Sequence, residues 1–175
     1  MTSAFTPLHD LLIRAMKDML YVENAVRQEL FHYERLSSNS ALRQLLVAHG
    51  RTAEKQIQSL KACFAELGIP PESVACPAID GMIREGREMT DEFLNSPAMD
   101  SVIIFMHRAM QHYEFARYSS MIGWCQVLEL ETIGSGLSKI LNQELSLEIR
   151  LLELATEGID DIATEQSEEA GGTAG

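Results

Sequence analysis

The stretch MLYVENAVRQEL, residues 19–30, has the helical periodicity from which the fold can be inferred. Positions three or four residues apart share one face of an α-helix. One such face contains four apolar residues and one carboxylate: Met16, Met19, Glu23, Val26 and Leu30. An apolar face is expected to be buried, so the position of Glu23 in the middle of it needs a physical reason.

The composition limits the class of protein. A length of 175 residues suits one well-buried domain, and a hydrophobic content of 46% is typical of a globular chain. The formal net charge of −12 argues against nucleic-acid binding, because an acidic surface repels phosphates. No apolar run approaches the roughly 20 residues of a membrane span, and the N-terminus lacks a secretory pattern. Cys63, Cys76 and Cys125 include no C-x-x-C pair, and we interpret them as reduced thiols of a cytoplasmic protein.

The apolar periodicity of the rest of the chain predicts four long helices and one short one. Start signals such as Thr6-Pro7 and stop signals such as Gly68 bound the segments. The expected helices cover residues 7–36, 41–67, 78–94, 98–128 and 137–162, with a break at ETIGSG (131–136). Short links make two antiparallel hairpins, and a crossover containing the short helix joins them. We therefore expect an all-α four-helix bundle over residues 1–163 and a disordered acidic tail over 164–175.

Carboxylates interrupt the apolar faces of the other long helices as well. The last long helix has Glu144 and Glu148 one turn apart, and the helix before it has Glu114. The second helix has His49 on its apolar face and Glu54 one position away from that face. Buried carboxylates lose solvation and repel one another, and a shared cation removes both costs.

Di-iron and di-manganese bundles use such an arrangement, with Glu from two helices and Glu-x-x-His from the other two. The alternative is that each Glu lies at the edge of its face with its carboxylate in solvent, and that His49 is a hydrogen-bonded core residue. The remaining histidines have no ligand-like partner at i+3 or i+4. The candidate metal ligands are Glu23, His49, Glu54, Glu114, Glu144 and Glu148.

Five segments resemble the bacterial YciE/YciF family, ferritin-like proteins associated with stress responses. The segments are LYVEN (20–24), HGRTAEKQIQSL (49–60), CPAIDGMIREG (76–86), QHYEFARYSSM (111–121) and NQELSLEIRLLELA (142–155). The resemblance spans about residues 8–155 and implies a ferritin-like bundle that forms a homodimer. It also implies a di-metal site, and the site acids of the family match Glu23, Glu114, Glu144 and Glu148.

The chain departs from the family pattern at several site positions. The family usually has Glu-x-x-His where this chain has Arg51 to Glu54, and an acid where it has Gln111. Arg117, one turn after Glu114, is also unusual at its position. A guanidinium cannot ligate a metal but can pair with carboxylates. One interpretation is a degenerate site in which Arg51 and Arg117 neutralise the acids. In the other, Arg51 reaches solvent and Glu54 takes part in metal ligation.

Two main functions follow from these interpretations. The first is a stress-associated structural or interaction module with a degenerate central site and no cofactor. The alternative is a di-iron or di-manganese oxidase or peroxide-consuming enzyme, which needs bound metal with an open coordination position. Iron storage is a weaker third hypothesis, because nothing in the sequence indicates a large hollow assembly.

Overall fold

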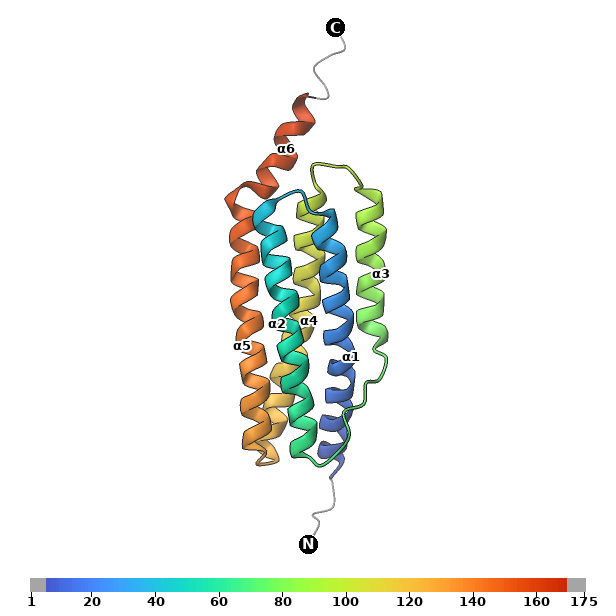
Figure 1. The fold of residues 1–175 in the computed structure, drawn as a ribbon, viewed down its shortest axis with the longest axis vertical. Coiled ribbons are helices and arrows are strands. Elements are labelled where there is room, and N and C mark those ends of the chain that lie inside the picture. Colours follow the sequence, from blue (N-terminus) through green and yellow to red (C-terminus); the bar gives the residue numbers. More distant parts are fainter. Residues whose placement is uncertain (1–5, 170–175) are drawn as a thin grey trace.

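The computed structural model describes the backbone of residues 6–169 and the side chains of residues 6–164. The elements of that part are α1 (Pro7–Leu36), α2 (Ser40–Glu66), α3 (Pro77–Glu92), α4 (Met99–Val127), α5 (Glu131–Leu154), a π-helical turn η1 (Ala155–Ile159) and α6 (Asp160–Glu169). The long helices α1, α2, α4 and α5 lie side by side as a bundle (Figure 1). The predicted all-α, ferritin-like four-helix bundle is confirmed.

The four long helices are arranged as two antiparallel hairpins, α1 with α2 and α4 with α5 (Figure 1). Contacts of α2 with α5 and of α1 with α4 close the bundle. The crossover carries α3 along the outside of the bundle, against α1 and α4. The backbone N–H of Val74 donates to the carbonyl of Lys17 at 3.2 Å, which holds the start of the crossover against α1. The crossover returns the chain to the end where α2 began, so α2 and α4 run in the same direction.

Helix boundaries follow the capping signals of the sequence. Thr6 caps α1 by accepting the backbone N–H of His9, with Pro7 in the first turn. Asn39 caps α2, and its Oδ1 accepts the backbone N–H groups of Ala41 and Leu42 at 2.9 and 3.0 Å. Gly68 follows α2 with a φ of +69°, a conformation that glycine adopts at low cost.

The prediction that a break at ETIGSG precedes the last long helix is wrong, because α5 begins at Glu131 and not at Leu137. A Cβ atom at Gly134 would lie 3.2 Å from the Cβ of Cys125. A Cβ atom at Gly136 would lie 3.1 Å from the Sγ of Cys63. The two glycines therefore allow α5 to pack closely on α4 and α2, where a turn had been expected.

The chain bends at the end of α5, where Gly158 has a φ of +119° within η1. The hydroxyl of Ser101 donates to Asp160 at 2.5 Å, which connects the start of α6 to α4. Beyond this contact α6 extends past the end of the bundle (Figure 1). The tail expected to be disordered from residue 164 is helical as far as Glu169, and residues 170–175 lie outside the described part.

Asp100, in the first turn of α4, caps the link between α1 and α2. Its Oδ1 accepts the hydroxyl of Ser37 at 2.6 Å and the backbone N–H of Ser38 at 3.1 Å. Its Oδ2 accepts the hydroxyl of Ser38 at 2.6 Å and the backbone N–H of Asn39 at 3.0 Å. One buried carboxylate thus fixes the first hairpin against the start of the second.

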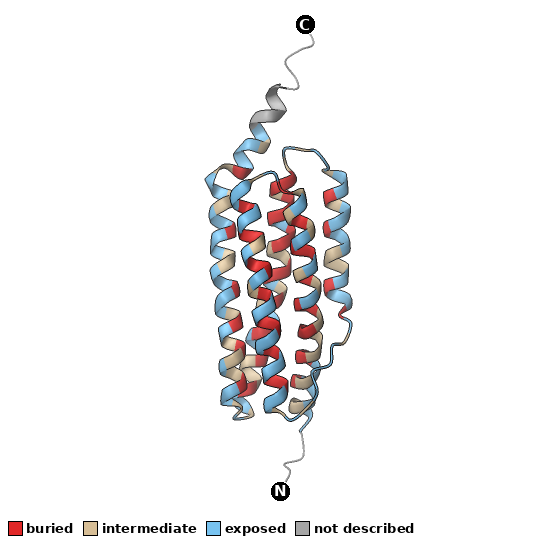
Figure 2. Cartoon of the chain, viewed as in Figure 1, coloured by how far each residue is buried: buried red, intermediate tan, exposed pale blue. Residues whose placement is uncertain are grey.

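Buried residues line the inward sides of the four long helices along most of their length (Figure 2). Tyr33, Tyr118 and Phe64 are the largest of the fully buried side chains. Among the helices that the structure describes, none has an apolar run long enough to cross a lipid bilayer. The centre of the bundle also contains acidic, imidazole and amide side chains, and these form the candidate site.

A buried carboxylate cluster at the centre of the bundle

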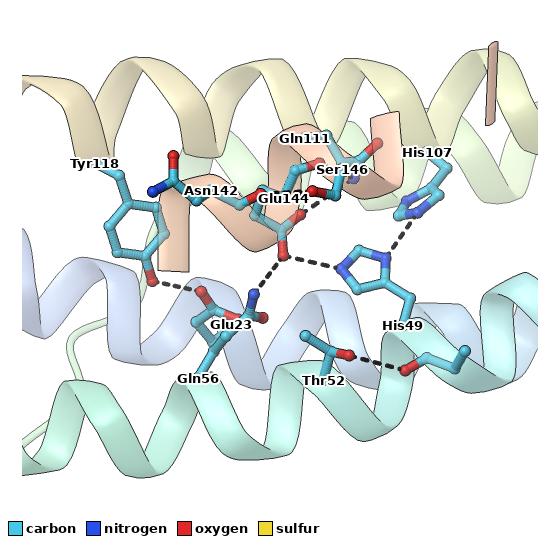
Figure 3. Close-up of polar contacts among 11 residues, drawn as sticks. Glu23, His49, Thr52, Gln56, His107, Gln111, Tyr118, Asn142, Glu144 and Ser146 are labelled. Atoms are coloured by element: carbon cyan, nitrogen blue, oxygen red, sulfur yellow. Dashed lines mark hydrogen bonds and ion pairs between the residues drawn. The ribbon is translucent and has the colours of Figure 1, made fainter. Parts of the chain in front are cut away.

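Eight buried polar side chains from all four long helices form the candidate site. Most of them are drawn in Figure 3, where they point toward one another between the helices. α1 contributes one, α2 two, α4 four and α5 one. They are Glu23, His49, Gln56, His107, Gln111, Glu114, Tyr118 and Glu144. Their positions at helical spacing within otherwise apolar faces bring them together inside the bundle.

Glu144 is at the centre of the hydrogen-bond network (Figure 3). The side-chain amide of Gln56 donates to its Oε1 at 2.7 Å, and Nε2 of His49 lies 3.1 Å from the same oxygen. The amide of Gln111 donates to its Oε2 at 3.1 Å. Both carboxylate oxygens of Glu144 therefore already have nitrogen partners from α2 and α4.

The imidazoles of His49 and His107 extend this network along the bundle. Nδ1 of His49 lies 3.0 Å from Nε2 of His107, and the ring centroids are 4.9 Å apart. Burial lowers the pKa of His107 to about 3, and the charge of His49 adds to this effect. His107 is therefore neutral at physiological pH.

The carboxyls of Glu23 and Glu114 lie near Glu144 but have different surroundings. The hydroxyl of Tyr118 donates a short hydrogen bond to Glu23. Within the described residues, Oε2 of Glu114 has no hydrogen-bond partner. Burial, followed by the charge of Glu144, raises the pKa of Glu23 to about 8. Burial, followed by the charges of Glu23 and Glu144, raises the pKa of Glu114 well above its usual range. Glu23 therefore holds its proton near neutral pH, and the pKa of Glu114 moves in the same direction.

Glu144 titrates in the opposite direction. Burial alone would raise its pKa, but the charge of His49 and the hydrogen bonds from His49, Gln111 and Gln56 lower it to about 2. The cluster thus places one carboxylate with a lowered pKa, held by nitrogen donors, beside two carboxyls with raised pKa values.

Two of the predicted ligands lie outside this cluster. Glu54 is exposed on α2 and lies 3.6 Å from Nη2 of Arg27. Oε1 of Glu148 accepts from Arg108, with Nη2 at 2.7 Å, and lies 3.2 Å from Nε2 of His112. The expected convergence therefore includes Glu23, Glu114, Glu144 and His49, whereas Glu148 forms ion pairs between α4 and α5.

The predicted neutralisation of the cluster by arginines is wrong. Arg51 is exposed on the outer side of α2, and Arg117 is exposed and stacks on the ring of Tyr113, 4.9 Å from its centroid. The helical phase of α2 explains the error, because the inward positions are His49, Ala53 and Gln56. Positions 51 and 54 lie outside that face and are exposed.

Three members of the cluster, Gln56, His107 and Tyr118, were not predicted from the sequence. Gln56 was visible on the apolar face of its helix, but an amide is not a typical metal ligand. His107 has no ligand-like partner at i+3 or i+4 in the sequence, and its partner His49 lies on another helix. Tyr118 lies one turn after Glu114, and the sequence gives no sign that it contacts Glu23 on α1.

The residues present do not fit a dinuclear metal centre of this bundle class. Such a centre takes a Glu-x-x-His pair from each of two helices. The inward pair on α2 is Ala53 and Gln56, and the residue three positions after Glu144 is Leu147. Among the residues that the structure describes, no group of three or more His, Cys, Asp or Glu side chains is arranged to hold a metal ion.

The fold and the cluster define a class: ferritin-like four-helix bundles with carboxylates buried between the helices. Within this class the chain belongs to the family described as a domain of unknown function, DUF892, whose model matches residues 7–164. The chain is also similar to protein YciF of Escherichia coli strain K12, with 23% identity over 154 residues, 87% of this chain and 93% of that protein. The resemblance to the YciE/YciF family is confirmed.

Two solved structures share the fold. YcfI of Rhodopseudomonas palustris, proposed to be a structural protein, is 32% identical and has a TM-score of 0.81, covering 86% of this chain and 96% of that one. The Escherichia coli stress protein YciF has a TM-score of 0.83 at 23% identity, covering 89% of this chain and 99% of that one.

Proposed function

We propose that this chain is a stress-associated structural or interaction protein of the YciF type, which works in the cytoplasm as a homodimer and without a di-metal centre. Its membership in the family supports the stress association, since one relative is a stress protein. The description of YcfI supports a structural role. Buried, unpaired Cys63, Cys76 and Cys125 suit a reducing compartment.

A line of exposed apolar side chains on α5 is the observation that carries this proposal. Leu145 is 44% exposed, Ile149 59% and Leu152 46%, and Phe105 on α4 is 61% exposed. The three residues of α5 have the spacing i, i+4, i+7 and so form one continuous line on the helix. Large apolar side chains gathered on one face are typical of an interaction site.

A second copy of the chain is the partner that suits this face. The line from Leu145 through Ile149 to Leu152 is nearly symmetric about its middle residue, so it can pack on itself in antiparallel orientation. The neighbouring charge is largely compensated, because Arg108 pairs with Glu148. Two chains with a formal charge of −12 each would approach most easily at such a compensated face.

The enzymatic alternative rests on the convergence of Glu23, Glu114 and Glu144. A redox di-metal enzyme needs carboxylate oxygens that are free to ligate and an open coordination position. Here both oxygens of Glu144 accept from nitrogen donors, and neither Glu-x-x-His pair is present. This geometry favours the structural or interaction function over catalysis.

Light scattering coupled to size exclusion tests the proposal. We expect the wild-type protein at twice the 19.5 kDa chain mass, and the I149D/L152D variant at the mass of one chain. V127D is the matched control, because Val127 is 73% exposed but lies at the end of α4, far along the chain from Phe105. A wild-type protein at 19.5 kDa would contradict the proposed homodimer. A dimeric I149D/L152D variant would show that the dimer interface does not include Ile149 and Leu152.

A further inference from the structure

Two glutamine side chains bind the same buried carboxylate from opposite helices. Nε2 of Gln56 on α2 lies 2.7 Å from Oε1 of Glu144 on α5. Nε2 of Gln111 on α4 lies 3.1 Å from Oε2 of the same carboxylate. All three side chains are almost completely buried. The amide nitrogens are the atoms that face Glu144, because a carboxylate accepts hydrogen bonds and cannot donate them when ionised.

Both glutamines lie on inward faces of their helices, and Gln56 lies where a metal centre of this class needs a ligand. Gln56 lies three residues after Ala53 on the inward face of α2, the place of the histidine in a Glu-x-x-His pair. Gln111 lies one turn before Glu114 on the inward face of α4. A glutamine amide is close in size to a glutamate or histidine side chain, and here the N–H groups of both glutamines face Glu144. An N–H group binds a carboxylate and does not ligate a cation. The amide oxygens of the two glutamines have no hydrogen-bond partner among the described residues.

We propose that the amides of Gln56 and Gln111 take the place of the metal ions in this bundle. Together with His49, they give both oxygens of Glu144 nitrogen partners and connect α2, α4 and α5 around it, so that this carboxylate needs no metal. The inference rests on the proposed metal-independent function and adds the residues that make it possible. Both glutamines bind the same carboxylate, so removing Glu144 separates their hydrogen-bond contribution to stability from their contribution to packing.

The physical basis is the cost of an ionised carboxylate inside an apolar bundle. A buried charge without donors is strongly unfavourable, and hydrogen bonds to it are stronger than those between neutral groups. Cations can meet this need, but they can be removed by a chelator. Amides are part of the chain, so the stability of the bundle should not depend on added or removed metal.

A double-mutant cycle tests the proposal. The Q56M/Q111M variant keeps the length of both side chains and removes both donors. We expect its melting temperature to fall by about 5–10 °C. Each lost hydrogen bond to a charged group lowers the free energy of unfolding, and a loss of about 1 kcal/mol lowers the melting temperature of a chain of this size by a few degrees. Q58M is the matched control, because Gln58 is exposed on the same helix, and its melting temperature should stay within about 1 °C. If the double variant does not fold, Q111M alone gives the same comparison.

Removing the charge itself completes the cycle. In an E144M background the two glutamines have no carboxylate to bind. The Q56M/Q111M substitutions should then lower the melting temperature by at most half as much as they do in the wild-type background. An equal loss in both backgrounds would show that the glutamines act only through packing and would overturn the inference. A wild-type melting temperature that falls with a chelator and is restored by iron or manganese would also overturn it. Neither outcome bears on the homodimer, which is measured by mass.

Discussion

At the scale of single residues, the cluster shows how neighbours decide the ionisation of identical side chains. Glu144 and Glu23 are both buried carboxyls in the same bundle. The charge of His49 and the hydrogen bonds from three nitrogen donors hold the pKa of Glu144 down at about 2, against the effect of burial. Glu23 has the Tyr118 hydroxyl as its hydrogen-bond donor, so burial dominates and its pKa rises to about 8. The neighbouring charges and hydrogen-bond donors, more than the burial that the two share, account for the difference.

The raised pKa of Glu23 predicts a loss of stability toward alkaline pH. The folded protein holds this proton up to about pH 8, whereas the unfolded carboxyl loses it near 4.5. The contribution is therefore fully present below pH 4.5 and is lost as the pH rises through 8. In urea unfolding at pH 5 and pH 8, the wild-type protein should lose up to about 1.4 kcal/mol per pH unit through this group. The Glu23→Gln variant should lose less over the same interval.

The control for this measurement is Glu54→Gln, which changes an exposed carboxyl of the same type. Its unfolding free energy should depend on pH as that of the wild-type protein does. Equal slopes for Glu23→Gln and the wild-type protein would show that Glu23 is ionised in the folded state near neutral pH.

At the scale of single elements, the phase of α2 decides which residues belong to the site. His49, Ala53 and Gln56 are buried, whereas Arg51 and Glu54 are exposed on the same helix. Two residues correspond to a rotation of about 200° around an α-helix. The Glu-x-x-His pair expected at positions 51 and 54 is two residues away from the inward positions 53 and 56, so it falls on the outside of the helix. The same element thus accounts both for the absence of a Glu-x-x-His pair inside the bundle and for the error in locating it.

This phase predicts where a metal site could be restored. The A53E/Q56H variant places a Glu-x-x-His pair on the inward face of α2, next to Glu144. After reconstitution with iron or manganese, elemental analysis should find more bound metal than in the wild-type protein, because carboxylate and imidazole replace a methyl group and an amide.

The matched control introduces the same pair of residues on the outer side of the same helix. The R51E/E54H variant should hold no more metal than the wild-type protein, since both positions face solvent. Circular dichroism verifies that both variants fold. If a folded A53E/Q56H variant binds no more metal than R51E/E54H, positions 53 and 56 are not the ligand positions of α2.

At the scale of the whole molecule, a few polar contacts fix the two hairpins and the crossover relative to one another. Asp100 joins the link between α1 and α2 to the start of α4. On the crossover, Arg87 of α3 donates to the buried Glu29 of α1 at 2.9 Å, and Tyr21 donates to Asp80 at 2.8 Å. These contacts connect residues about 60 positions apart, so they form only when the bundle is assembled.

The Asp100 contacts predict a large loss of stability for Asp100→Ala. The substitution removes four hydrogen bonds to one carboxylate, two of them from backbone N–H groups. We expect the unfolding free energy in urea to fall by about 2–4 kcal/mol. Asp91→Ala, which changes an exposed carboxylate at the end of α3, should cost less than about 0.5 kcal/mol. A loss for Asp100→Ala no larger than that of Asp91→Ala would contradict the role of Asp100 in joining the hairpins.

The sequence by itself determined the fold class and most helix boundaries. Apolar residues at helical spacing and caps such as Thr6 and Asn39 act locally, so they can be read without the tertiary structure. The same periodicity placed Glu23, His49, Glu114 and Glu144 on inward faces. Gly134 and Gly136 misled the prediction of α5, because a glycine required for close packing and a glycine required for a turn look alike in sequence.

The tertiary structure alone decided which groups meet in the centre and in which ionisation state. The partners of Glu144 come from α2 and α4, and His107 meets His49 across the bundle. Such contacts depend on the rotation of each helix about its axis, which a periodicity fixes only to within a residue or two. The prediction that Arg51 lies in the cluster came from the resemblance to the family at residues 51–54, whereas the periodicity itself placed Gln56 on the inward face of α2. The buried carboxylate of Glu144 therefore has amide and imidazole partners, and burial raises the pKa of Glu23 and Glu114, where the sequence had predicted arginines or metal ions.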